Sequence, residues 1–158
     1  MAKNWIWVGK YLFVILLAIV LGAAIGNLAL FKTATLGTPK LTAGVLARFI
    51  AHTTALGLLW FLGLRASQQL REGSGGMTSL AVPILSLVAL IVVPSFYVVL
   101  LQFINPFLSR DLKPFIDWAF IVGTLAAATW LVWAFFTNMD AVLEAIRRAA
   151  VSKKKPEH

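Results

Sequence analysis

The stretch from Met77 to Ile104 reads MTSLAVPILSLVALIVVPSFYVVLLQFI and contains no charged residue. A helix needs about 20 predominantly apolar residues to cross the hydrocarbon core of a bilayer, so this stretch is long enough to span a membrane. Three further stretches have the same character: Trp5–Phe31, Leu41–Leu64 and Phe115–Phe136. We therefore predict an all-α integral membrane protein with four transmembrane helices arranged as two antiparallel hairpins.

The composition of the whole chain agrees with a location in the membrane. The 158 residues are 60% hydrophobic and 13% charged, whereas soluble domains contain about 25% charged residues. The segments between the apolar stretches are too short to form a separate soluble domain. We expect one transmembrane domain over residues 1–138, followed by a basic tail over residues 139–158 that forms a short amphipathic helix.

The distribution of Lys and Arg predicts the orientation of the chain. The ends predicted to share a side with the two termini carry Lys3, Lys10, Arg65, Arg71, Arg147, Arg148 and Lys153–Lys155, and the opposite ends carry Lys32, Lys40, Arg110 and Lys113. The positive-inside rule then places both termini in the cytoplasm, and we favour a bacterial inner membrane over an organellar one. We expect the basic tail to contact anionic lipid headgroups. No basic folded module is present, so we do not expect nucleic-acid binding.

Arg48 is the charged residue that lies deepest inside a predicted span. Charged groups are costly in hydrocarbon and are pointers to function or to a specific partner. Three interpretations stay open for this side chain. It extends to the outer surface, it forms an ion pair with Asp117 near the start of the fourth span, or it binds a ligand or anion.

His52 follows Arg48 by four residues and shares its helix face. One interpretation is a core histidine that forms a hydrogen bond to a neighbouring helix. The alternative is haem ligation between two subunits, because imidazole is a common axial ligand and the other histidine of the chain is His158 at the end. The chain contains no cysteine, and we predict neither a metal site nor a resident cofactor.

Small residues suggest where helices approach one another closely. Gly22 and Gly26 form a GxxxG motif at the outer end of the first span, and Asn27 beside them is a candidate for a hydrogen bond to the second span. A second small-residue stripe consists of Ala47, Ala51 and Ala55. Either stripe could serve packing within the chain or self-association between chains.

No catalytic template is present in the sequence. The spans hold no deep carboxylate and no nucleophile with a plausible base, so we do not expect an enzyme. The preferred prediction is a non-catalytic integral membrane subunit or scaffold whose partners are the lipid bilayer and other membrane subunits. The alternatives are a small oligomeric channel or transporter, whose path Arg48, His52, Asn27 and Pro94 would line, and a haem-binding anchor that uses His52.

Overall fold

The computed structural model describes residues 6–72 and 78–152. The sequence positions Lys3, Trp5, Met77, Lys153–Lys155 and His158, on which some expectations depend, lie outside the described residues. Within the described ranges, four stretches are long and apolar enough to cross a membrane: Ile6–Asn27, Ala43–Glu72, Thr78–Phe107 and Leu112–Asp140. The fold is therefore that of a helical, multi-pass membrane protein, as the sequence predicts.

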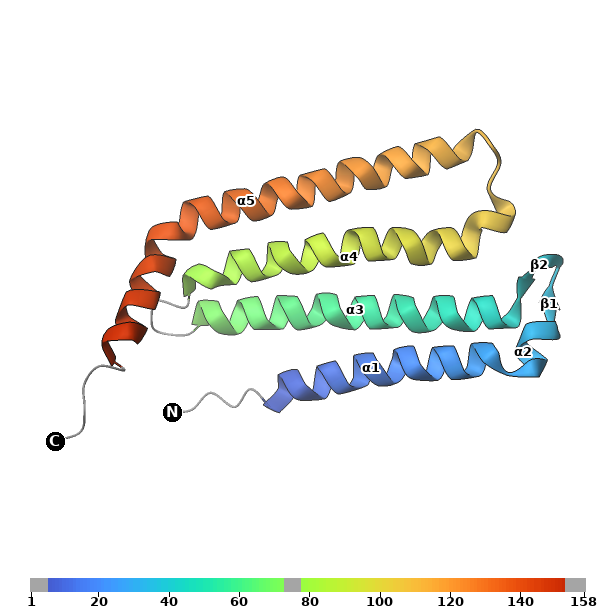
Figure 1. Cartoon of the computed structure of the whole chain (residues 1–158), viewed down its shortest axis with the longest axis horizontal. Helices are drawn as coiled ribbons and strands as arrows, with labels where there is room; N and C mark the ends of the chain where they lie inside the picture. The colour runs from blue at the N-terminus through green and yellow to red at the C-terminus, as the bar shows by residue number, and fades with distance from the viewer. Residues whose placement is uncertain (1–5, 73–77, 153–158) are drawn as a thin grey trace.

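The four long helices lie side by side in chain order (Figure 1). They are α1 (Ile6–Asn27), α3 (Ala43–Glu72), α4 (Ala81–Ile104) and α5 (Leu112–Ser152). Helix α1 packs on α3, α3 on α4, and α4 on α5, while α1 and α5 share no substantial contact among the described residues. The helices thus form an open row. The first and last helices of the row each have one neighbour among the long helices.

Short elements connect the long helices. After α1, the chain forms α2 (Ala29–Thr33) and two antiparallel strands, β1 (Thr35–Leu36) and β2 (Thr38–Thr42). Gly37 joins the strands with a φ of 75°, which glycine adopts at little cost. The 3₁₀ turns η1 (Thr78–Leu80) and η2 (Asn105–Phe107) flank α4. We call the end of the row that carries β1 and β2 the hairpin end, and the opposite end, where α1 starts, the terminal end (Figure 1).

Two helices run further than the apolar stretches that predict them. Helix α3 continues past Leu64 to Glu72, and α5 continues past Phe136 to Ser152, because neither extension contains Gly or Pro to stop it. The tail as far as Ser152 therefore continues α5 rather than forming a separate short helix. The hydroxyl of Thr137 donates a hydrogen bond to the carbonyl of Trp133 (2.9 Å), an arrangement that bends helices, and α5 changes direction in its last part (Figure 1).

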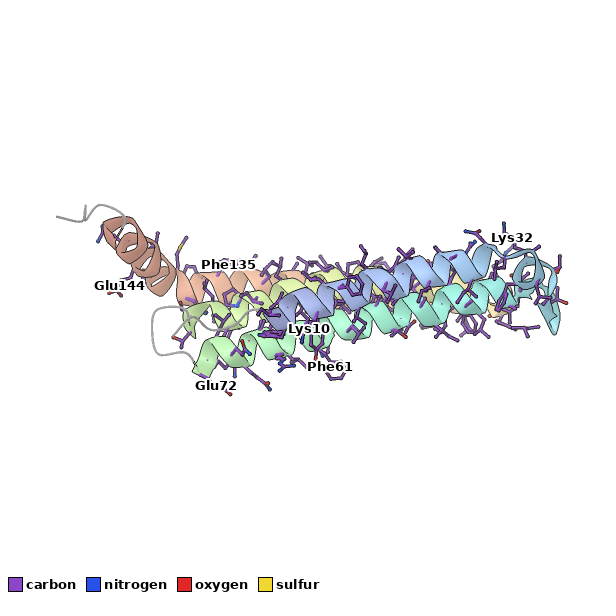
Figure 2. The ribbon with its side chains drawn as sticks, turned by 90° about the horizontal axis from the view of Figure 1, so that it is seen from below. Lys10, Lys32, Phe61, Glu72, Phe135 and Glu144 are labelled. Carbon is purple, nitrogen blue, oxygen red and sulfur yellow. The ribbon has the colours of Figure 1, made fainter. Side chains whose placement is uncertain are left out.

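Large apolar side chains cover the outside of the row. Phe13 of α1 is 64% exposed and Val132 of α5 is 70% exposed. Figure 2 shows carbon-rich side chains along the whole length of the row, with Lys32 at the hairpin end and Glu72 at the terminal end. An apolar surface of this extent needs lipid or other apolar helices around it, because in water such patches drive association.

Candidate functional site

The closest helix–helix contact that involves the predicted residues is between α1 and α3. Gly22 and Gly26 are buried, and a Cβ atom on Gly22 would overlap the side chain of Ala51. A Cβ atom on Gly44 of α3 would lie 2.8 Å from the carbonyl oxygen of Gly26. The GxxxG motif therefore packs against α3 of the same chain.

The alanine stripe of α3 lies along the same part of the helix. Ala55 is 4% exposed, whereas Ala47 and Ala51 are half-buried. The backbone carbonyl of Ala47 and the side chain of Ala51 both border the space that a Cβ atom on Gly22 would enter. Small residues on both helices thus allow the two backbones to approach closely.

Arg48 crosses from α3 to the end of α1. Its Nη2 atom donates hydrogen bonds to Oδ1 of Asn27 (2.6 Å) and to the carbonyl oxygen of Gly26 (3.4 Å). A Cβ atom on Gly26 would lie 2.8 Å from Cγ and Nε of Arg48, so the glycine makes room for the arginine stem. The hydrogen bond expected between Asn27 and the second span is present, and its donor is Arg48.

Both of these acceptors are neutral, and the sequence-based alternative of an Arg48–Asp117 ion pair is not what the structure contains. Asp117 pairs with Lys113 instead. A guanidinium group has five N–H donors in a planar fork, and the contacts with Asn27 and Gly26 use only the Nη2 nitrogen. The remaining donors leave this group able to bind an anionic or polar group at the hairpin end of the membrane.

The imidazole of His52 makes its hydrogen bond within its own helix. Its Nδ1 atom lies 2.7 Å from the carbonyl oxygen of Arg48, one turn earlier. A carbonyl only accepts, so Nδ1 of His52 is the donor in this contact. The sequence suggests a hydrogen bond from His52 to a neighbouring helix, whereas the structure shows one to its own helix.

A second polar cluster joins α4 to α5 near the hairpin end. The hydroxyl of Tyr97 donates to Oδ1 of Asp117 (2.6 Å), and Nζ of Lys113 donates to Oδ2 of the same carboxylate (2.7 Å). The ring of Tyr97 also contacts Phe120, with ring centroids 5.2 Å apart. This cluster fixes α4 against the first turns of α5. Lys113 and Asp117 are spaced by four residues, a signal of pairing that is visible in the sequence, whereas Tyr97 is on another helix and gives no such signal.

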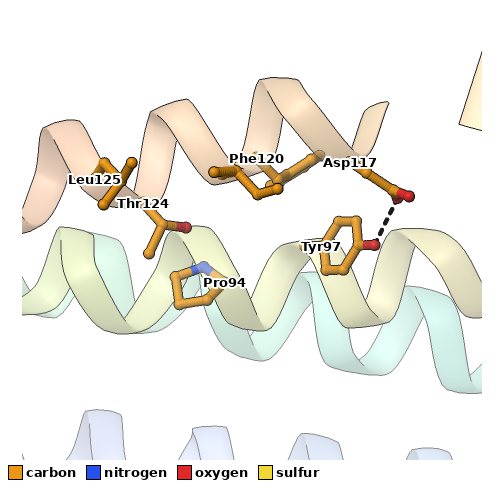
Figure 3. A pocket seen from close by; sticks show the side chains of 7 residues that line it. Pro94, Tyr97, Asp117, Phe120, Thr124 and Leu125 are labelled. Carbon is orange, nitrogen blue, oxygen red and sulfur yellow. Dashed lines mark hydrogen bonds between the residues drawn. The ribbon is translucent and has the colours of Figure 1, made fainter. Parts of the chain in front are cut away.

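A lateral groove of about 420 Å³ opens beside this cluster, between α4 and α5. Its lining includes Pro94, Tyr97, Asp117, Phe120, Thr124 and Leu125 (Figure 3). Pro94 lies inside α4. It has no amide hydrogen, so the helix lacks one backbone hydrogen bond at this position. Sequence reasoning identified Pro94 and Asp117 but not the groove, because their proximity depends on how the two helices pack.

The terminal end of the α1–α3 contact is held by aromatic residues. Nε1 of Trp7 donates to Oε1 of Gln69 (3.1 Å). The guanidinium of Arg65 lies 5.0 Å from the centre of the Trp7 ring and 6.0 Å from that of Tyr11. Trp7 and Tyr11 are half-buried, and their cation–π contacts with Arg65 hold α1 against α3.

In the part of the chain that the structure describes, no group of three or more His, Cys, Asp or Glu side chains is placed to hold a metal ion. No protein-family model matches the chain, no curated protein resembles it in sequence, and no solved structure matches its fold.

Proposed function

We propose that this chain is a non-catalytic integral membrane subunit that packs against partner helices in a larger membrane complex. The observation that carries the proposal is the open row, in which, over residues 6–72 and 78–152, α1 and α5 each pack against one of the other long helices. Transmembrane helices associate through van der Waals packing and a few interhelical hydrogen bonds. The two edge helices of the row keep most of their surface available for such packing.

The exposed faces of the edge helices support this role. Leu16 of α1 is 64% exposed, and Trp133 and Phe136 of α5 are 66% and 74% exposed. Aromatic residues supply large contact areas with few rotatable bonds, and they are enriched in the centres of protein interfaces. The polar groups of the α1–α3 and α4–α5 contacts are engaged in holding the row together, as a scaffold requires.

We further infer that the row crosses the membrane as two antiparallel hairpins, α1 with α3 and α4 with α5, with both termini in the cytoplasm. The excess of Lys and Arg on the side that the sequence assigns to the termini supports this orientation, and a bacterial inner membrane is the preferred location. Arg147 is exposed on the last part of α5. The basic end of α5 would then lie at the cytoplasmic surface, against anionic headgroups.

The two alternative functions receive less support from the geometry. The residues that a channel path would use are divided between two contacts, with Arg48 and Asn27 at α1–α3 and Pro94 at α4–α5. Haem ligation would need the Nε2 atom of His52 from two copies of the chain. An absorption spectrum of the purified protein tests the haem alternative, because a bound haem gives a Soret band.

Site-specific photocrosslinking in native membranes tests the proposed function. A photoreactive residue replaces Leu16 of α1 or Val132 of α5, and a matched set replaces Phe61 of α3 or Ile91 of α4, which are 60% and 47% exposed. We expect a discrete, stoichiometric protein adduct from at least one edge-helix position. Adducts with lipid alone at every position would overturn the proposal.

A further inference from the structure

The groove between α4 and α5 changes from polar to apolar along its length. At one end, the carboxylate of Asp117 accepts hydrogen bonds from Tyr97 and Lys113. Away from this end, the lining consists of the apolar side chains of Pro94, Phe120, Ile121 and Leu125, together with Thr124. Figure 3 shows Tyr97 and Asp117 joined at one end, with Leu125 at the other. A site with this profile suits an amphiphile with one polar end.

The length and direction of the groove match one leaflet of a bilayer. Asp117 and Leu125 are eight residues apart on α5, which corresponds to about 12 Å at the helical rise of about 1.5 Å per residue. Half of a hydrocarbon core of about 30 Å is about 15 Å. Lys113 is the second residue of α5, so the polar end lies near the membrane surface and the apolar part points toward the membrane centre.

The polar end of the groove carries a positive and a negative side chain next to each other. Nζ of Lys113 lies 2.7 Å from Oδ2 of Asp117, and the two side chains keep 49% and 28% of their surface exposed. An ammonium group has three N–H donors and a carboxylate has about four acceptor positions. Each charged group therefore retains capacity for a further partner, and the pair is complementary to a headgroup that carries one anion and one N–H-bearing cation.

We propose that this groove binds a phospholipid with a primary ammonium headgroup, of the phosphatidylethanolamine class. Its phosphate contacts Lys113, its ammonium donates to Asp117, and one acyl chain lies along Phe120, Ile121 and Leu125. A choline headgroup has no N–H to donate to Asp117. A purely anionic headgroup brings no cation to this carboxylate and adds negative charge beside it.

The binding is tested by native mass spectrometry of the full chain released from nanodiscs that contain phosphatidylethanolamine, phosphatidylcholine and phosphatidylglycerol with matched acyl chains. We expect one retained phosphatidylethanolamine per chain. Asp117→Asn and Lys113→Gln should each reduce this preference by roughly tenfold, since charge-assisted hydrogen bonds are the stronger class. Equal retention of the three lipids by the unchanged protein would overturn the headgroup assignment.

A neighbouring pair of residues provides the control for the location. Ile121 lines the groove, whereas Val122 does not and is 59% exposed. Ile121→Trp fills the groove and should abolish retention of the lipid, while Val122→Trp adds the same bulk outside it and should leave retention unchanged. Retention unaffected by Ile121→Trp would overturn the proposed location. If that variant does not fold, the headgroup preference of the near-isosteric Asp117→Asn variant decides the question, and an unaltered preference overturns the proposal.

Discussion

The Nη2 atom of Arg48 lies 2.6 Å from Oδ1 of Asn27, so one charge-assisted hydrogen bond joins α3 to the last residue of α1. Within a bilayer, such a bond competes with few alternative partners, although measured contributions of interhelical bonds are only about 0.6–2 kcal/mol. This contact and the glycine packing beside it determine how the first two spans of the row meet. Both can be tested by substitution.

The Arg48–Asn27 bond predicts non-additive effects on stability. Arg48→Met and Asn27→Ala should each destabilise the protein in detergent, and the double variant should be less destabilised than the sum, with a coupling of about 0.6–2 kcal/mol. Unfolding in a denaturing detergent, monitored by circular dichroism, measures all four proteins of the cycle. Strictly additive effects would show that the two side chains do not interact in the membrane protein.

Glycine packing predicts a strong position dependence within α1. Gly22→Ala places a methyl group against Ala51, and overpacking of this kind costs about 1–3 kcal/mol. Gly9→Ala is the matched control, because no atom lies within 4 Å of the added Cβ, and it should be neutral or stabilising by up to about 1 kcal/mol through helix propensity. The same unfolding measurement compares them; equal stability of the two variants would contradict the close contact at Gly22.

The cation–π contact at the terminal end predicts a smaller effect. Arg65→Gln removes the charge above the Trp7 ring and should cost about 0.5–1 kcal/mol. Arg71→Gln, in the last turn of the same helix, removes the same charge and is the control. A shift in Trp fluorescence should accompany Arg65→Gln and not Arg71→Gln, and a spectrum unchanged by Arg65→Gln would argue against the contact.

The sequence predicts the four spans correctly because length and hydropathy are properties of each segment alone. It also identifies the small residues and Asn27 as candidates for helix–helix contacts, because small residues allow close approach and a polar side chain in a span needs a hydrogen-bond partner. The partners of these residues depend on which helices become neighbours. For this reason the sequence leaves Arg48 with three interpretations, and it gives no signal that Asp117 accepts a hydrogen bond from Tyr97 on another helix.

The orientation of the chain can be tested directly, because the natural sequence contains no cysteine. Thr35→Cys lies at the hairpin end and Gln68→Cys near the terminal end, and both positions are exposed. A membrane-impermeant maleimide should label Thr35→Cys in intact cells and Gln68→Cys only after permeabilisation. The reverse pattern would place the termini outside the cytoplasm.

The mass of the assembly that is released from native membranes in a mild detergent or nanodisc shows whether the row associates with partner helices. We predict that native mass spectrometry finds this chain in a complex of fixed stoichiometry with other membrane subunits. A bulky charge on an edge helix, introduced by Val132→Arg, should dissociate the complex. The uncharged substitution Val132→Leu should leave the complex intact. A monomer that carries only lipid, both for the unchanged protein and for the two variants, would contradict this proposal.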